Sequence, residues 1–184
     1  MRRIAEEVHE MTQRIDMKRR VAHFRDLVFG ENAFLDAYIP GHERQHVQVI
    51  GEGVVESSGP RPAIEADAEF TVSYTRVPPG NGNMLHDHKT VEVFIPLNSR
   101  WRIVWGEEGQ HSVELEPYDM ISIPPGVHRL YTNIGNVEGL LLTVLGGRDS
   151  GKVMWAKAVL DEARSRGVTL DAKGEIVAVD RGGR

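Results

Sequence analysis

The stretch from Gly80 to Glu92 reads GNGNMLHDHKTVE and places two histidines and a carboxylate within a few positions of one another. Successive side chains on a β-strand point to opposite faces, so residues two or four positions apart share a face. His86, His88 and Glu92 have these separations, and on an unbroken strand all three would lie together. Two imidazoles and one carboxylate are a donor set for a divalent transition metal. Taken alone, the pattern also suits a surface strand on which Glu92 is merely solvated.

Composition narrows the kind of metal and the kind of partner. The 184 residues include no cysteine, which excludes disulfides and thiolate metal sites. Imidazole and carboxylate ligands suit iron, manganese, nickel or zinc. A net charge of −5 leads us to expect no nucleic-acid partner and no anionic membrane surface. The N-terminus lacks the apolar core of a signal peptide and no apolar run approaches the ~20 residues of a membrane span, so we expect a cytoplasmic protein.

The middle of the chain, from about residue 45 to 146, consists of short β-patterned runs. In the clearest of them Phe70, Val72 and Tyr74 alternate with hydroxyl residues, which is the period of a strand. Turn signals rich in glycine, proline and asparagine separate the runs. The expected strands include residues 47–50, 70–75, 101–105, 120–123, 129–132 and 140–145. Short strands at this spacing are typical of a sandwich or a small barrel.

Helical patterns are expected at both ends of the chain. Apolar residues recur at three-to-four spacing near the N-terminus, which predicts a helix over residues 3–28. A second helix in the tail has an apolar face and ends before Gly167, which is placed as a helix stop. We expect one domain, with an N-terminal helical extension over 1–45, a β-barrel over 46–148, and a C-terminal helix and tail over 149–184.

The opening stretch resembles the first motif of the cupin superfamily, G-x5-H-x-H-x3-E. Gly80, His86, His88 and Glu92 match this motif at every spacing, and Ser99 stands where a glycine usually closes it. Because several spacings agree at once, the resemblance is specific for the fold. It implies an all-β double-stranded β-helix, in which two antiparallel sheets curl into a jelly-roll-like cupin barrel. The helical extensions at the two ends lie outside the motifs.

The second cupin motif, G-x5-P-x-G-x2-H-x3-N, is matched in register by Pro124, Gly126 and Asn133. It departs from the family pattern at two places. Tyr118 stands at the first glycine, and Arg129 stands at the position that supplies the family's histidine. A histidine is present at His128, one residue before the position at which the motif expects it.

The offset between His128 and Arg129 leaves two arrangements open. A shift of one residue on a strand sends a side chain to the opposite face. If the motif register holds, Arg129 and Tyr131 face the barrel lumen and His128 points away. If a bulge near Pro125-Gly126 slips the register, His128 turns inward as a fourth metal ligand. A third reading is that Arg129 replaced a ligand in a protein that no longer uses metal.

With Arg129 in the lumen, His86, His88 and Glu92 alone have the composition of the facial triad of non-haem iron oxygenases. Arginine has no lone pair to offer a metal, but its guanidinium could pair with a carboxylate or enolate substrate. A divalent ion, one glutamate and one guanidinium leave about two excess positive charges, which favours an anionic ligand. The Tyr131 hydroxyl is a further candidate near the site, by parity alone.

We therefore expect a metal-dependent small-molecule enzyme of cupin type, with dioxygenase-like chemistry on a small carboxylate or enolate. Iron or manganese is the expected cofactor, with nickel and zinc as alternatives. The alternative function is a non-catalytic cupin that binds or senses a small ligand, with or without metal, since one fold hosts many activities. The tail helix and exposed sheet edges are compatible with a homodimer.

Overall fold

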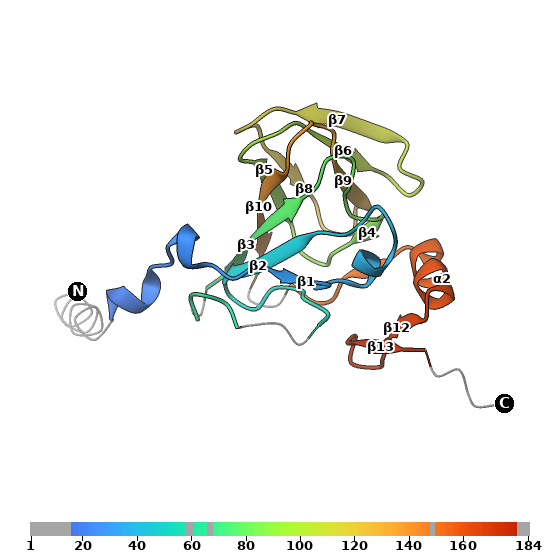
Figure 1. Ribbon diagram of the computed structural model, residues 1–184, viewed down its shortest axis with the longest axis horizontal. Helices are drawn as coiled ribbons and strands as arrows, with labels where there is room; N and C mark the ends of the chain where they lie inside the picture. Colours follow the sequence, from blue (N-terminus) through green and yellow to red (C-terminus); the bar gives the residue numbers. More distant parts are fainter. Residues whose placement is uncertain (1–15, 58–60, 66–67, 148–149, 180–184) are drawn as a thin grey trace, which may run out of the picture.

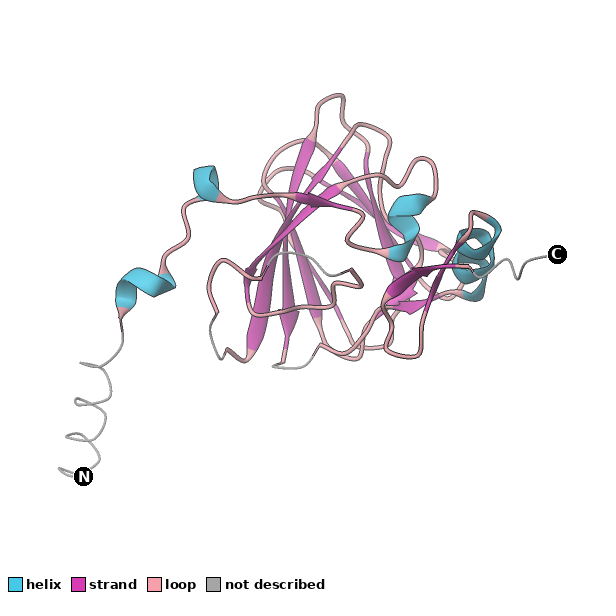
Figure 2. Cartoon of the chain, turned by 60° about the horizontal axis from the view of Figure 1, so that its bottom comes forward, coloured by secondary structure: helices cyan, strands magenta, loops and turns pink. Residues whose placement is uncertain are grey.

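The computed structural model describes residues 16–57, 61–65, 68–147 and 150–179, which form two facing antiparallel sheets and a separate hairpin (Figure 1). The first sheet has the order β1-β2-β3-β10-β5-β8, formed by Gly30–Glu31, Gln45–Ile50, Phe70–Val77, Gly139–Gly146, Glu92–Pro96 and Ile121–Ile123. The second has the order β11-β4-β9-β6-β7, formed by Met154–Trp155, His86–Asp87, Arg129–Asn133, Trp101–Trp105 and His111–Leu115. The strands enclose an interior between the sheets (Figure 2). This is the jelly-roll-like, all-β barrel that the sequence predicts.

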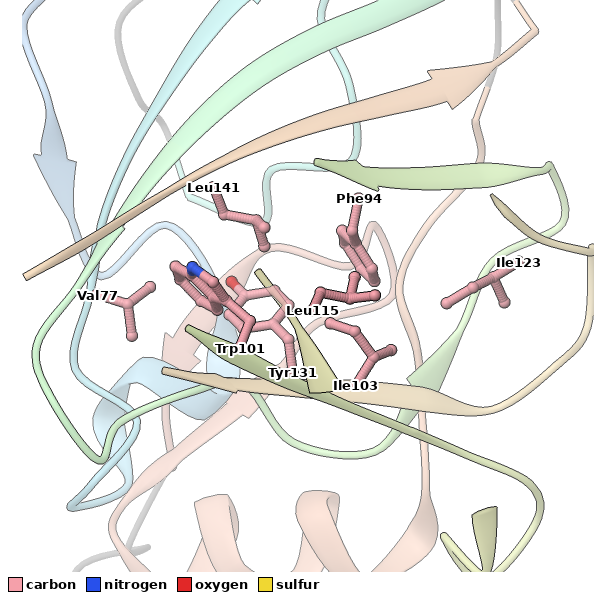
Figure 3. Close-up of a cluster of buried hydrophobic side chains, with 8 residues drawn as sticks. All are labelled: Val77, Phe94, Trp101, Ile103, Leu115, Ile123, Tyr131 and Leu141. Carbon is pink, nitrogen blue, oxygen red and sulfur yellow. The ribbon is translucent and has the colours of Figure 1, made fainter. Parts of the chain in front are cut away.

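Apolar side chains fill one part of the barrel interior (Figure 3). The cluster contains Val77, Phe94, Trp101, Ile103, Leu115, Ile123, Tyr131 and Leu141. The Tyr131 ring packs edge-to-face on Phe94 and Trp101, with ring centroids 5.4 and 5.6 Å apart. Along β3 the buried positions change from Val77 to Thr75 and Ser73. The interior therefore becomes polar beyond the apolar cluster.

Two turns keep the backbone conformation of the motif glycines although the glycines are absent. Ser99 has φ +59° and Tyr118 has φ +74°, both in the left-handed region, where a side chain costs roughly 1–2 kcal/mol. The Ser99 hydroxyl offsets part of this by donating to Oδ1 of Asn133 at 2.7 Å. Tyr118 is 75% exposed and gains little packing in return. The turn geometry is therefore set by the strands that it connects.

The N-terminal helix predicted over residues 3–28 is wrong for the part that the structure describes. From Asp16 onward the chain forms two short 3-10 turns, η1 (Met17–Arg20) and η2 (Phe24–Asp26), with extended backbone between them. The ring of Phe24 packs edge-to-face on Tyr74 of β3, with centroids 5.3 Å apart. Phe24 thus packs on the outer face of a sheet, whereas Met17, Val21 and Val28 are exposed to solvent.

The C-terminal helix is present as α2 (Lys157–Ser165), and Gly167 follows it with φ +90°, as expected for a helix stop. The residues after it form a hairpin that the sequence pattern did not predict, β12 (Val168–Leu170) with β13 (Ile176–Ala178). Residues 180–184 lie outside the described residues. No helix in the described part of the chain is both long and apolar enough to cross a membrane.

A second apolar cluster ties both ends of the chain to the barrel. Its buried members come from η3 (Leu35–Tyr38), the residue after it, and α2; they are Leu35, Ile39, Val159 and Ala163. Met84, just before β4, and Trp155 of β11 pack against it. β1 precedes residue 46 and belongs to the first sheet, and β11 follows residue 148 and belongs to the second. The two sheets therefore include residues on both sides of the expected barrel limits of 46–148.

Candidate metal centre

His86, His88 and Glu92 meet inside the barrel, but they do not lie on one unbroken strand as the sequence pattern assumed. β4 ends at Asp87 and β5 begins at Glu92, and these two strands belong to opposite sheets. The chain crosses between the sheets at this point, and the three side chains converge from both. Their candidate ligand atoms lie within 4.8 Å of one another, and all three residues are buried.

Both imidazoles are prepared to act as ligands. Nδ1 of His86 lies 2.8 Å from the carbonyl oxygen of Met84, and because a carbonyl only accepts, Nδ1 carries the proton and Nε2 keeps its lone pair. Burial, aided by Arg129, lowers the pKa of His86 well below its ordinary value. The same two causes lower the pKa of His88 to about 3. Both rings are therefore neutral at pH 7, as metal binding requires.

Glu92 is held by Arg129. Nε and Nη2 of Arg129 each lie 2.7 Å from Oε2 of Glu92, and the guanidinium also donates to the carbonyl of Val127 at 3.2 Å. The other carboxylate oxygen, Oε1, lies 3.8 Å from Nε2 of His88. Burial raises the pKa of Glu92, and the Arg129 guanidinium opposes that rise. One carboxylate oxygen is thus engaged, and the other is directed toward the imidazoles.

The structure places Arg129 inside the barrel and His128 outside it. Arg129 lies opposite His86 in the β4–β9 pairing, and its side chain is fully buried. His128 points the other way, with Nε2 3.5 Å from Oδ2 of Asp87 and its side chain 30% exposed. The motif register therefore holds without a slip. His128 is not brought to the three grouped residues, so the arrangement with a fourth histidine ligand is not the one observed.

A cavity of about 40 Å³ opens beside the three grouped residues. Tyr131 lines it, as expected from parity, whereas Arg129 does not appear in its lining and stands behind Glu92. Burial raises the pKa of Tyr131 to about 12, and its hydroxyl is hydrogen-bonded to Thr75. Tyr131 is therefore a neutral hydroxyl at physiological pH.

The cavity wall opposite the histidine pair comes from the first sheet and was not identified as part of the site from the sequence. Its polar members are Arg44, His46, Gln48, Ser73, Thr75 and Thr143. The signal was present in the strand over 70–77, where the inward positions carry hydroxyls and the outward ones carry Val72 and Tyr74. Periodicity shows that two faces differ, but it does not show which face is inside.

Two buried carboxylates support the site from outside the cavity. Oδ1 of Asp36 lies 2.6 Å from Nη2 of Arg44, and its Oδ2 accepts from the backbone N–H of Met84 at 2.8 Å. Glu56 accepts from the indole N–H of Trp155 at 2.7 Å, and the Trp155 ring packs on His86 with centroids 5.3 Å apart. Asp36 and Glu56 therefore hold the segment before His86 and one side of its ring.

The donor set fits a divalent transition metal. Such an ion binds imidazole nitrogen and carboxylate oxygen at ~2.0–2.2 Å, so ligands of one ion are at most ~4.4 Å apart. Donor atoms within 4.8 Å of one another approach this limit and need only small side-chain movements. Three protein ligands would leave further coordination positions toward the cavity. The residues that would hold the metal are His86, His88 and Glu92.

Comparison with known proteins concerns the fold. No protein-family model and no curated protein matches the sequence. A cupin 2 domain-containing protein from Halorhodospira halophila aligns with a TM-score of 0.50 and 18% identity, over 67% of this chain and 77% of that chain. The DMSP lyase DddQ from Ruegeria pomeroyi aligns with a TM-score of 0.50 and 18% identity, over 74% of this chain and 59% of that chain. An oxalate oxidase aligns with a TM-score of 0.44 and 16% identity. The alignment covers 50% of this chain and 48%, about half, of that protein.

Proposed function

Because the chain has the cupin fold, we propose that it is a metal-dependent enzyme that acts on a small anionic substrate. The observation that carries the proposal is the buried group of two neutral imidazoles and one carboxylate beside a cavity. Iron or manganese is the cofactor that best suits these ligands, with nickel and zinc as alternatives. When bound, the metal would supply Lewis-acid chemistry and, in a dioxygenase-like reaction, a binding position for oxygen.

The charges around the site favour an anionic substrate. Arg129 neutralises Glu92, and Asp36 neutralises Arg44 at the opposite wall. The imidazoles contribute no charge because their pKa values are lowered. A divalent ion would therefore leave two uncompensated positive charges in a buried site, which is costly unless an anion joins them. A substrate carboxylate or enolate meets this requirement.

In this function Arg129 is a positioning residue. Its guanidinium contacts Glu92 and the Val127 carbonyl and stands outside the cavity lining. It would keep Glu92 ionised and aim Oε1 at the metal position. Arg44, in contrast, does line the cavity, on the wall opposite the histidines. Tyr131 would contribute a neutral hydroxyl.

Metal analysis tests the proposal directly. Untagged protein is incubated with ferrous or manganous ions, desalted, and its metal content is measured. We expect about one equivalent of metal in the wild type and in His128→Ala, and a strong loss of bound metal in His88→Ala. The reason is that His88 belongs to the grouped donors and His128 does not. Less than ~0.2 equivalents in the wild type would refute the proposal, since a formed ligand set should retain divalent metal.

A binding or sensing protein is the second candidate. It is favoured by the Arg129–Glu92 pair, which satisfies the buried carboxylate without any metal. Oxygen consumption by the iron-loaded protein with a panel of short carboxylates and enolates separates the two functions. Tight binding of such a compound with no turnover would favour the binding protein. Turnover that disappears in His88→Ala would favour the enzyme.

A further inference from the structure

Around the cavity, β3 and β10 carry polar side chains on the inner face of the sheet and apolar side chains on its outer face. On the outer face of the sheet these strands carry Val72, Tyr74, Leu142 and Val144, which are only partly buried. Their inward positions include hydroxyl residues, among them Thr143. Burying a hydroxyl is unfavourable unless it is hydrogen-bonded. Farther along the same strands the inward positions of Val77 and Leu141 are apolar, whereas Ser73, Thr75 and Thr143 line the cavity beside the metal group.

One chain of hydrogen bonds crosses this wall, and its direction can be assigned. The Gln48 amide nitrogen donates to two backbone carbonyls, so its carbonyl oxygen accepts from Nε2 of His46 at 3.4 Å. Nδ1 of the neutral His46 ring then accepts from the Thr75 hydroxyl at 3.1 Å. Thr75 is also hydrogen-bonded to the Tyr131 hydroxyl. These four side chains are linked by hydrogen bonds and form a floor of the cavity.

Ser73 and Thr143 lie beside this floor, on neighbouring strands. Ser73 is directly opposite Thr143 in the β3–β10 pairing and opposite Gln48 in the β2–β3 pairing. Leu145, two residues after Thr143, is directly opposite Glu92. Thr143 and Glu92 are therefore diagonal neighbours across two strands, a spacing of about 7–8 Å. A short molecule in the cavity could therefore contact both the hydroxyl pair and the metal group that includes Glu92.

We propose that Ser73 and Thr143 form a hydroxyl-recognition subsite, and that the substrate is a short hydroxy acid. Its carboxylate would lie at the metal group, and a hydroxyl distal to that carboxylate would bind between Ser73 and Thr143. This inference rests on the proposed function and deepens it. A serine and a threonine hydroxyl can each donate and accept, so the pair can satisfy both the proton and the lone pairs of a substrate hydroxyl.

The cavity favours a short substrate. Its volume is about 40 Å³, against the ~300–1,000 Å³ of pockets that enclose a drug-sized ligand. A three-carbon acid suits such a volume better than an extended sugar acid does. Size and hydroxyl recognition together point to the class of three-carbon dihydroxy acids and their close analogues.

Calorimetric titration with glycerate, lactate and gluconate tests the subsite, with and without manganous ion and with metal content measured on the same samples. Glycerate and lactate share the carboxylate and the 2-hydroxyl, so their affinity ratio isolates the distal hydroxyl. We expect the wild type to bind glycerate about tenfold more tightly than lactate, which corresponds to one hydrogen-bonding site. Gluconate should not bind at the same concentrations.

The variants Ser73→Ala and Thr143→Val should bring the glycerate-to-lactate ratio close to one and leave lactate affinity within about twofold. Thr143→Ser keeps the hydroxyl and should keep the ratio. Thr132→Val is the matched control, because Thr132 is at an outward position of β9 and its loss should change neither ligand. Thermal unfolding of each variant confirms that it is folded.

Two results would overturn the subsite: equal affinity for glycerate and lactate in the wild type, or a preference that survives both hydroxyl deletions. No binding of either acid, with or without metal, would also overturn it. Failure of the proposed function is a separate result, because it appears as absence of bound metal. In that case the glycerate-to-lactate ratio of the metal-free protein still decides for or against the subsite.

Discussion

Replacing Arg129 with methionine should destabilise the metal-free protein strongly, because it leaves Glu92 buried beside no cation. Arg129 is fully buried, and Nε and Nη2 of its guanidinium each lie 2.7 Å from Oε2 of Glu92. Removing one partner of a buried ion pair costs about 3–5 kcal/mol. For a chain of this size each kcal/mol lowers Tm by roughly 2–4 °C, so the expected fall is roughly 6–20 °C.

The assay is urea unfolding of chelator-treated protein, as a double-mutant cycle with Glu92→Gln. Each single variant leaves one charged partner unpaired, whereas the double variant leaves neither. We expect the double variant to be more stable than the sum of the single losses predicts, by about 2 kcal/mol or more. Additive losses, or an Arg129→Met variant within about 1 kcal/mol of the wild type, would refute the claim that this pair is energetically coupled.

The pH dependence gives the same experiment a second readout. Loss of the guanidinium removes the interaction that opposes the burial-driven rise in the pKa of Glu92. The folded variant then keeps a proton that the unfolded chain releases, and its stability falls as pH rises. The deficit of Arg129→Met relative to the wild type should therefore shrink toward acidic pH. A deficit that is constant with pH would mean that lost packing, and not the unpaired carboxylate, causes it.

Three further predictions concern the scaffold and can be measured by chemical unfolding. A Cβ at Gly82 would lie 1.9 Å from a backbone oxygen, so Gly82→Ala should lower the stability by about 3 kcal/mol or more. At Gly126 no atom lies within 4 Å of an added Cβ, so Gly126→Ala should lower the stability only by the strain of a left-handed backbone, about 1–2 kcal/mol. Tyr118→Gly should gain up to about 1 kcal/mol, because it relieves a positive φ at an exposed side chain, and a clear loss would contradict the strain assigned to this turn. Burial raises the pKa of Glu56 from 4.5 to about 7, so folded Glu56 holds a proton that the unfolded chain releases. The stability of the wild type relative to Glu56→Gln should therefore fall by about 3 kcal/mol between pH 4.5 and 7. Parallel pH profiles of the two proteins would disprove this prediction.

Much of the barrel could be predicted because strand signals are local. The alternation over 70–75 and the apolar run over 140–145 correspond to β3 and β10. The helix expected over residues 3–28 is absent from the described residues 16–28 for a different reason. Spacing at three to four residues records where apolar side chains fall, and in the structure the ring of Phe24 contacts Tyr74 and Arg76 on the outer face of β3. Tertiary packing overrides a weak helical pattern in this way.

The sequence by itself determined that Arg129 and His128 point to opposite sides of β9, because parity is a property of adjacent residues. It left open which of the two points inward, and the structure places Arg129 inside and His128 outside. Only the tertiary structure decided what Arg129 contacts. Glu92 comes from the opposite sheet, and the pairing of the two depends on how the sheets close around the lumen. The same holds for the wall of Ser73 and Thr143, whose strands join the metal group only through long-range pairing. Local periodicity cannot specify contacts that exist only when a sheet curls on itself.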